Sequence, residues 1–273
     1  MELNEKKTVS ITDIGNFMDC RRRGVLRLTN WGREAMDMSE MPVSATKVCG
    51  ILAHDFAEII YDEDLTYDSV LVKNKELLER QIRYDSRLPD SYTLVKTAHK
   101  IGYAAAMWAW GFAKKNNIGA DQVQSEVELE YGGVKGRLDF LIMDDKRAFI
   151  VDLKVGSRRA DSDSVKRYVH QMAGYRWLVQ MLYKNIKCVS LIIHVTTADP
   201  DNVRHFLINP RLAEESVLKS AETLHELKEQ IEDVPYMFYS ANVNSIHCNR
   251  SSCPFYDNKQ LCPETFTPPK QEA

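Results

Sequence analysis

Three features that would assign the chain to a broad class at once are missing from its sequence. No run of about 18 uncharged apolar residues occurs, so we expect no membrane-spanning helix. The 273 residues carry a formal net charge of −3, so any contact with nucleic acid must come from local basic patches. Residues 1–15 lack the apolar core of a secretory signal. These absences predict a soluble protein of the cytoplasm.

Internal repeats and low-complexity tracts are also missing ahead of a Pro-rich tail. Apolar residues make up 44% of the chain, enough for one large domain with a full core. Hydrophobic periodicity favours helices over residues 10–30, 44–61, 163–183 and 211–233. Residues 62–120 form a further stretch that is helical but irregular. Strand patterns cover 122–131, the segments around Asp139 and Asp152, 188–196 and 203–208. The order predicts a mixed α/β fold.

The segment with the most chemical information is VKGRLDFLIMDDKRAFIVDLKVG, residues 134–156. Asp139 ends one apolar-flanked run, and Asp152 lies on a second run and is followed by Leu153 and Lys154. A short polar turn at 144–146 would join two strands and bring the two carboxylates side by side. Lys154 shares a strand face with Asp152, because residues two apart point to the same side.

Two carboxylates beside a lysine suit metal-assisted hydrolysis of a phosphodiester. Mg²⁺ and Mn²⁺ prefer hard oxygen ligands, which Asp139, Asp152 and the backbone carbonyl of Leu153 supply. The Lys154 ammonium would orient or help deprotonate the water, or stabilise the transition state. The alternative is a buried salt bridge, or an Asp and a Lys on a solvated face. Charged residues in apolar strands favour the functional interpretation.

The stretches GRLDFLI, IVDLKVG and HQMAGYRWL, with GILAHDFAE upstream, resemble the PD-(D/E)XK nuclease superfamily in its RecB-like exonuclease branch. The resemblance implies a restriction-endonuclease-like core, a mixed central sheet flanked by helices. It implies that Asp139 and the Asp152-Leu153-Lys154 element are catalytic, and that His54 is a metal ligand. Gln171 and Tyr175 match the branch's Gln-x-x-x-Tyr signature and, four apart, share one helical face. The resemblance implies that both are catalytic and that this face contacts the substrate phosphate or the catalytic water.

Each of the helical residues has a plainer interpretation. Tyr175 would be core, Gln171 an ordinary satisfied polar group, and His54 a common helix histidine. Glu126 is either a further acid that reaches the metal through water or one member of a solvated stripe with Glu128 and Glu130.

Cysteines form a second constellation. Cys248, Cys253 and Cys262 lie within fifteen residues near the end, and Cys20 lies far upstream. This distribution resembles the iron–sulfur RecB-like nucleases, which include CRISPR-adaptation exonucleases and the AddB-type nuclease domain, and it implies a [4Fe–4S] cluster. The intervals of four and eight residues depart from the family's two and about five, so Zn²⁺ with Cys20 or His247, or unrelated free thiols, stay open. The other two cysteines, Cys49 and Cys188, have apolar contexts typical of a core.

Local basic patches would grip phosphates without reading sequence, or would be ordinary solvated faces. Arg21 and Arg22 follow Cys20, and Arg137 precedes Asp139 by two positions. Arg158 and Arg159 follow the Asp-x-Lys element.

Taken with the resemblance, these patterns predict a Mg²⁺- or Mn²⁺-dependent DNA exonuclease that acts on single-stranded ends. The family setting implies a prokaryotic or phage-infected cell, a role in recombination, repair or CRISPR adaptation, and a protein partner from one of these processes. A non-catalytic protein that binds DNA ends or a partner, and a structure-specific endonuclease, are the alternatives. We expect residues 1–245 to form the nuclease domain, with 62–120 as a helical insertion, and 246–273 to form a Cys-rich tail completed by Cys20.

Overall fold

The computed structural model describes residues 8–29, 44–62, 64–84, 90–230, 241–242, 248, 253, 255–256 and 260–262, with side chains omitted at 80–84 and 228–230. The chain divides into two compact units. The first comprises Met1–Met41, Gly132–Lys135 and Glu215–Ala273, and the second comprises Pro42–Tyr131 and Gly136–Glu214. The predicted boundaries at 62–120 and at residue 246 stay predictions.

In the described residues a mixed sheet of six strands organises the fold, which confirms the predicted mixed α/β type; β1 was not among the predicted strands. Its strand order is β1-β3-β4-β5-β6, and β2 also pairs with β3. The strands are β1 (Val9–Ser10), β2 (Val123–Tyr131), β3 (Val134–Met143), β4 (Arg147–Gly156), β5 (Lys187–Thr196) and β6 (Asp199–Ile208). Pairs β3–β4 and β5–β6 are antiparallel, whereas β4–β5 is parallel. The parallel step is bridged by a helix, as parallel strands require.

The β3–β4 hairpin fixes the position of the acid pair. Phe140 lies opposite Val151 in the antiparallel register, so the next positions along the two strands are Asp139 and Asp152. The turn begins at Asp144, whose carboxylate accepts hydrogen bonds from the backbone N–H groups of Lys146 and Arg147 at 2.9 and 2.7 Å. This Asx-type turn holds the register that the sequence predicted.

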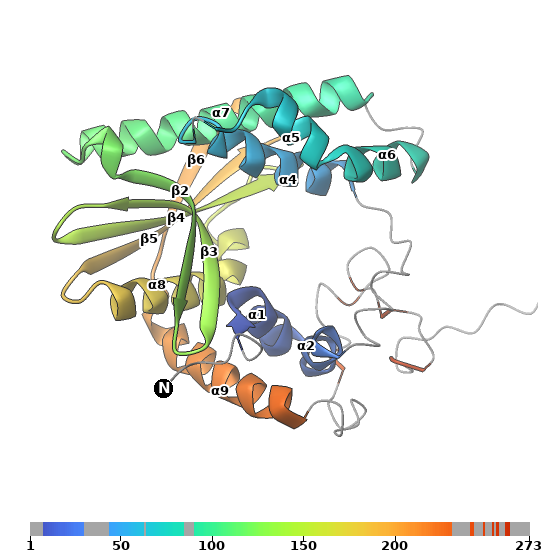
Figure 1. Cartoon of the computed structure of the whole chain (residues 1–273), viewed down its shortest axis with the longest axis vertical. Helices are drawn as coiled ribbons and strands as arrows, with labels where there is room; N and C mark the ends of the chain where they lie inside the picture. Colours follow the sequence, from blue (N-terminus) through green and yellow to red (C-terminus); the bar gives the residue numbers. More distant parts are fainter. Residues whose placement is uncertain are drawn as a thin grey trace, which may run out of the picture. The chain divides into compact units, whose positions relative to one another are not determined.

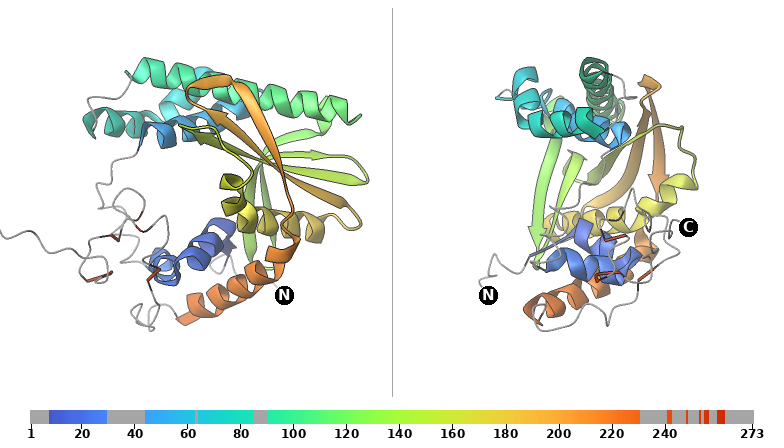
Figure 2. Two further views of the ribbon diagram at one scale, coloured as in Figure 1. Left: turned by 180° about the vertical axis from the view of Figure 1, so that it is seen from behind. Right: turned by 90° about the vertical axis from the view of Figure 1, so that its right-hand side faces the viewer.

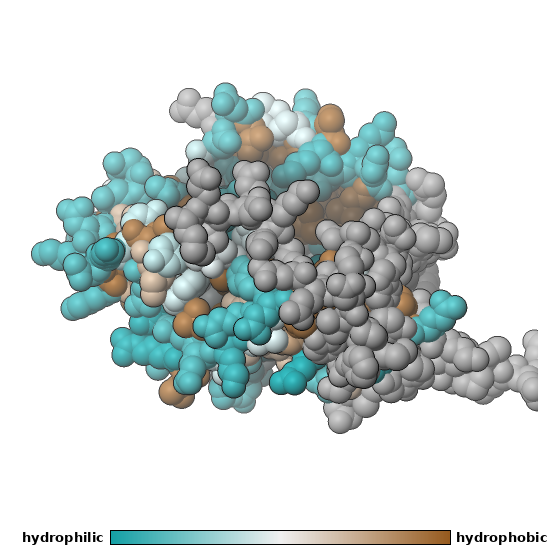
Figure 3. All heavy atoms as spheres, turned by 60° about the horizontal axis from the view of Figure 1, so that its bottom comes forward, coloured by the Kyte–Doolittle hydropathy of each residue, from teal (hydrophilic) through white to brown (hydrophobic). Residues whose placement is uncertain are grey.

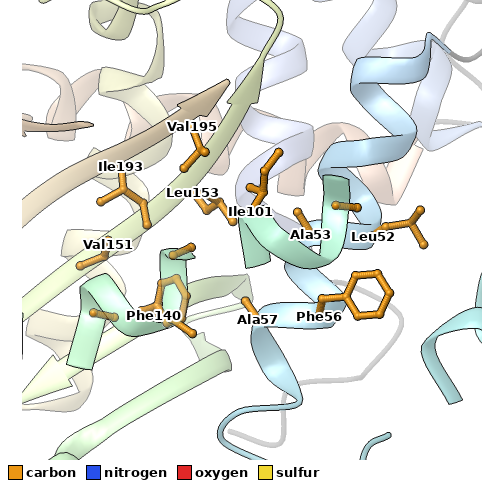
Figure 4. Packing of buried hydrophobic residues seen from close by; sticks show 14 of the residues in the cluster. Leu52, Ala53, Phe56, Ala57, Ile101, Phe140, Val151, Leu153, Ile193 and Val195 are labelled. Carbon is orange, nitrogen blue, oxygen red and sulfur yellow. The ribbon is translucent and has the colours of Figure 1, made fainter. Parts of the chain in front are cut away.

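One face of the sheet is covered by α4 (Ala45–Glu58) and α7 (Ser91–Lys115), which run side by side (Figures 1 and 2). Ser44 caps α4 by accepting a hydrogen bond from the Lys47 backbone N–H. The core beneath them joins helix residues such as Phe56 and Ile101 to strand residues such as Val151 and Leu153 (Figure 4). Two shorter helices, α5 (Tyr67–Lys73) and α6 (Lys75–Tyr84), contact α4.

The opposite face carries α8 (Val169–Leu182), preceded by a 3₁₀ turn, η3 (Ser164–Tyr168). Because Val151 and Leu153 enter the α4–α7 core, Asp152 between them points to the α8 face. Arg176 of α8 pairs with Glu214 at 3.0 Å. Glu214 begins α9 (Glu214–Gln230), which follows the short η4 turn (Arg211–Ala213).

In the first unit, the predicted helix over 10–30 is two helices, α1 (Ile11–Asp19) and α2 (Arg21–Leu28). Cys20 breaks it with an extended backbone, φ −148° and ψ 106°. Gly24 lets the helices approach closely, since a Cβ there would lie 2.4 Å from the Cα of Phe17. The break also turns the Cys20 Sγ toward the backbone N–H of Asn242, at 3.4 Å.

Within the described residues, no helix is both long and apolar enough to cross a membrane. Figure 3 shows one face of the molecule, on which hydrophilic side chains prevail over the described surface and hydrophobic ones are scattered.

Candidate active site

The two predicted acids have different surroundings although they lie opposite each other on β3 and β4. Asp152 is 1% exposed and points to α8. Asp139 accepts a hydrogen bond from the Leu153 backbone N–H through its Oδ2, at 2.5 Å. The contact that the structure gives Leu153 at the site is therefore through its N–H, while its side chain is core.

Asp152 is the centre of a polar network on the α8 face. Lys154 Nζ lies 2.6 Å from its Oδ2, and Gln171 Nε2 donates to its Oδ1 at 3.1 Å. The same Gln171 nitrogen donates to the Tyr175 hydroxyl at 2.9 Å. The four-residue spacing in α8 places Gln171 and Tyr175 on one face, so the helix orients an amide against the Asp-x-Lys element. Tyr175 is itself 5% exposed.

A second group of side chains meets Asp139 from the other side. His54 Nδ1, on α4, lies 3.2 Å from Asp139 Oδ1 and 3.6 Å from Glu126 Oε1 on β2. Within the described part of the chain, these are the three metal-ligating side chains whose donor atoms all lie within 4.8 Å of one another. Asp152 lies outside this group and is joined to it through the electrostatic influence of Asp139.

Glu126 is the functional candidate that sequence reasoning did not commit to. Its side chain is 9% exposed and pairs with Arg137 Nε at 2.8 Å, whereas Glu128 on the same strand is exposed. The backbone of Glu126 has φ +49°, a left-handed conformation that costs free energy in a residue with a side chain. This local departure from regular strand geometry separates Glu126 from the solvated stripe. Nothing in the sequence signals such a departure.

The pKa values of the two carboxyl groups, Asp152 and Asp139, are shifted in opposite directions. Burial raises the pKa of Asp152 to about 6, against the opposing charge of Lys154. For Asp139, burial acts in the same direction, but the charge of His54 and its hydrogen bond outweigh burial and hold the pKa below its ordinary range. The pKa of Lys154 is raised, because the charges of Asp152 and Asp139 outweigh its burial. Lys154 is therefore a firmly protonated cation.

His54 is also held in its charged form. Burial lowers its pKa, but the charge of Asp139 and the hydrogen bonds to Asp139 and Glu126 outweigh burial and raise the pKa to about 10. An imidazolium has no lone pair for a metal, so binding of a cation by this group must release a proton. Two carboxylates and one imidazole form a donor set that suits Mn²⁺ and also accepts Mg²⁺.

The four cysteines of the predicted cluster line one pocket in the first unit. Its other lining residues are basic or apolar: Arg22, Arg23, Leu26, Ala241 and Phe255. Burial raises the pKa of the Cys248 and Cys253 thiols, and the Arg23 guanidinium opposes the rise. Cys49 is buried in the core of the second unit, as expected, and Cys188 is half-buried. His247, the alternative zinc ligand, and the tail at 263–273 lie outside the described residues.

The predicted phosphate-binding arginines fall into different environments. Arg21 and Arg158 are exposed. Arg22 is 6% exposed and is one of the residues that line the cysteine pocket. Two others are exposed but already paired with carboxylates: Arg137 with Glu126, and Arg159 with Asp199 at 3.3 Å.

Comparisons with known proteins identify a family for the chain. The model of the PD-(D/E)XK nuclease superfamily matches residues 8–263. Comparison with curated proteins finds no match.

Five solved chains are similar, among them the following two. The crystal structure of a "Putative exonuclease" from Eubacterium rectale has 17% sequence identity and a TM-score of 0.55, and the match covers 89% of this chain and 91% of that one. At that identity the likeness shows the fold alone. The crystal structure of SSO0001 matches at 17% identity over 79% of this chain and 86% of that one, with a TM-score of 0.36, too low to support an inference.

The family match covers every strand of the sheet and every helix that carries a candidate site residue. The chain belongs to the PD-(D/E)XK nuclease superfamily.

Proposed function

We propose that the protein is a divalent-metal-dependent deoxyribonuclease that removes nucleotides from single-stranded DNA ends. The observation that carries the proposal is the convergence of His54, Glu126 and Asp139 within 4.8 Å, directly beside the Asp152–Lys154 pair. A structural salt-bridge cluster would have no need of three possible metal ligands held next to a protonated lysine.

Each residue has a proposed task. His54, Glu126 and Asp139 would hold the ion, with Asp152 and the Leu153 carbonyl as proposed additional ligands from β4. A divalent ion bound there would lower the pKa of its water and neutralise charge on the phosphoryl oxygens. Lys154, protonated and fixed 2.6 Å from Asp152, supplies positive charge where the transition state becomes more negative. Its raised pKa favours this task over that of a general base.

Gln171 and Tyr175 are proposed to organise these groups. The Gln171 amide hydrogen-bonds both Asp152 and Tyr175, so the Asp152 carboxylate is held in one orientation. With Asp152 fixed, Lys154 is fixed as well. Such preorganisation lowers the reorganisation needed when substrate charge develops.

We further propose that a [4Fe–4S] cluster is ligated by Cys248, Cys253 and Cys262 of the tail at 246–273, with Cys20 as the fourth thiolate ligand. The four thiols surround one pocket, and two arginines beside it would offset thiolate charge. In the described chain no three of these thiols lie within the 4.8 Å that joins the His54 group. A single tetrahedral Zn²⁺, with bonds of about 2.3 Å, would draw them closer, whereas a four-iron cube holds its ligands farther apart.

The test of the nuclease proposal uses end-labelled linear and closed circular single-stranded DNA with Mn²⁺. Release of nucleotides from the linear strand alone supports an exonuclease. Cleavage of the circle indicates an endonuclease on the same core, and inactivity on both indicates a DNA-binding protein. A process that produces single-stranded ends, such as recombination, repair or CRISPR adaptation, is the proposed setting, with a protein partner from that process.

A further inference from the structure

A line of basic side chains continues from Lys154 across the sheet. The register pairs Lys154 on β4 with His194 on β5, and His194 with Arg204 on β6. Directly paired residues project from the same face of a sheet, so all three share the α8 face with Asp152. These strands lie side by side in Figure 1. Neighbouring strands are about 4.8 Å apart, so the line leads about 10 Å away from the acids.

His194 is the buried member of this line. It is 4% exposed, and its Nδ1 is a buried nitrogen without a hydrogen-bond partner among the described residues. A buried polar atom without a hydrogen-bond partner is unfavourable, so its retention needs an explanation. Gly156 makes room for the ring, since a Cβ at that position would lie 2.7 Å from His194 Nε2. The imidazole is thus packed closely in place beside Lys154.

Two arginines stand next to His194. The charges of Arg167 and Arg204 both act on the imidazole. Both are exposed, and neither has an ion pair with any residue in the described part of the chain, unlike Arg137, Arg147 and Arg159.

Both guanidinium groups are nevertheless held in position. Arg204 Nη1 donates to the Ala160 carbonyl at 2.8 Å, and its guanidinium lies 5.6 Å from the centre of the Phe206 ring. Arg167 lies 4.9 Å from the centre of the Tyr168 ring, and Lys154 Nζ lies at the same distance from that ring. Cations fixed by neutral groups keep their donors available for an anion and lose little side-chain entropy when they bind it.

We propose that Arg167 and Arg204, with His194 between Lys154 and Arg204, form a subsite for a second phosphate of the nucleic-acid backbone, next to the phosphate at Lys154. The subsite rests on the proposed nuclease function. It adds a direction for the bound nucleic-acid strand, which would run across the sheet from β4 to β6. The phosphate is either an internal one or the terminal phosphate of a strand end.

Direct binding tests the subsite without turnover. Affinity for 3′-labelled oligodeoxythymidine is measured in EDTA over a series of salt concentrations for wild type and for Arg167→Gln/Arg204→Gln. We expect the double variant to bind about tenfold or more weakly. We also expect the slope of log K against log salt to fall by roughly 0.7 for each arginine. Arg211→Gln, which removes an exposed charge from η4, should leave affinity and slope unchanged.

Further arms separate the alternatives. The single variants Arg204→Gln and Arg204→Lys are measured in the same way. Lysine keeps the charge but not the planar fork that reaches Ala160, so Arg204→Lys should keep most of the slope that Arg204→Gln loses. An equally low slope in both would mean that Arg204 acts by holding the loop, and would overturn the subsite. A larger loss for a 5′-phosphorylated than for a 5′-hydroxyl strand assigns a terminal phosphate, and equal losses on both and on a circle assign an internal one. Unchanged binding in the double variant refutes the subsite. Wild-type binding without Mn²⁺-dependent cleavage instead refutes only the nuclease proposal.

Discussion

Glu126 and Glu128 are two positions apart on one strand, and only Glu126 is turned into the site. Because Glu126 has carboxylate oxygens near both His54 and Arg137, replacing it with glutamine removes a charged ligand without changing size. We expect Glu126→Gln to weaken Mn²⁺ binding and to lower DNA cleavage by about 100-fold or more. Calorimetric titration with Mn²⁺ and cleavage of labelled DNA measure the two effects.

Glu128→Gln is the matched control, with the same substitution on the same strand at an exposed position. It should bind Mn²⁺ and cleave DNA like the wild type. If both variants lose activity equally, the activity depends on the net charge of β2 and not on the position of Glu126, which would contradict the prediction.

The charged state of His54 predicts how the stability of the metal-free protein depends on pH. Its pKa is raised to about 10 in the folded state, above the ordinary value near 6.5 of the unfolded chain. The contribution of His54 to the free energy of unfolding is therefore fully present below about pH 6.5 and is lost as the pH rises through about 10. Urea unfolding in EDTA should show that His54→Gln is less stable than wild type at pH 6, with a gap that closes by pH 10. A gap that widens with pH would contradict the ion pair with Asp139.

At the residue scale, sequence spacing predicted which candidate side chains lie close together. A turn of known type between two apolar runs placed Asp139 opposite Asp152, and the four-residue spacing placed Gln171 with Tyr175. Their catalytic roles stay predictions. The left-handed backbone of Glu126 could not be predicted from the sequence, because it depends on how β2 passes α4 and β3 and not on the residue type.

At the scale of elements, the position of His54 depends on how closely α4 packs against α7. A Cβ at Gly102 on α7 would lie 2.5 Å from the Ala53 carbonyl oxygen and 2.8 Å from the Ala57 nitrogen. Gly102→Ala must therefore push the helices apart, and we expect the free energy of unfolding to fall by about 1–3 kcal/mol. Cleavage should fall as well, because Ala53 precedes His54 in the chain. Urea unfolding and the cleavage assay measure these changes.

Gly111→Ala on the same helix is the control, since a Cβ at that position would have no described atom within 4 Å beyond its own helix and chain neighbours. Alanine is the better helix former, so this variant should be unchanged or more stable by up to about 1 kcal/mol. Equal destabilisation by both substitutions would show that the α4–α7 contact is not tight.

Element types were largely predictable, and their interruptions were not. The strands around Asp139 and Asp152 and the helix within 44–61 agree with the pattern of apolar residues. The extended backbone at Cys20 was not predicted, because apolar periodicity continues through it. At that break the Cys20 Sγ accepts a hydrogen bond from the backbone N–H of Asn242, 222 positions away, and periodicity does not encode such a contact.

At the scale of the whole molecule, cysteines from both ends of the sequence meet in the first unit. If they hold an iron–sulfur cluster, anaerobically purified protein should be brown and contain about four iron atoms, as a [4Fe–4S] cluster requires. Cys248→Ser should lose the colour and the iron, and the first unit should lose stability because ligation contributes to its folding. Cys188→Ser, outside the pocket, should keep both. Colourless wild type with one zinc would contradict the cluster.

The account as a whole depends on a cation held beside Asp139 and Asp152 at the β3–β4 hairpin. The most direct measurement is Mn²⁺-dependent cleavage of end-labelled single-stranded DNA by wild type and by Asp139→Asn, with folding of both checked by circular dichroism. We predict progressive release of nucleotides by the wild type and a loss of about 1,000-fold or more in the variant, because one carboxylate serves both the ion and His54. Equal cleavage by the two folded proteins, or no cleavage by wild type that demonstrably binds Mn²⁺, would contradict it.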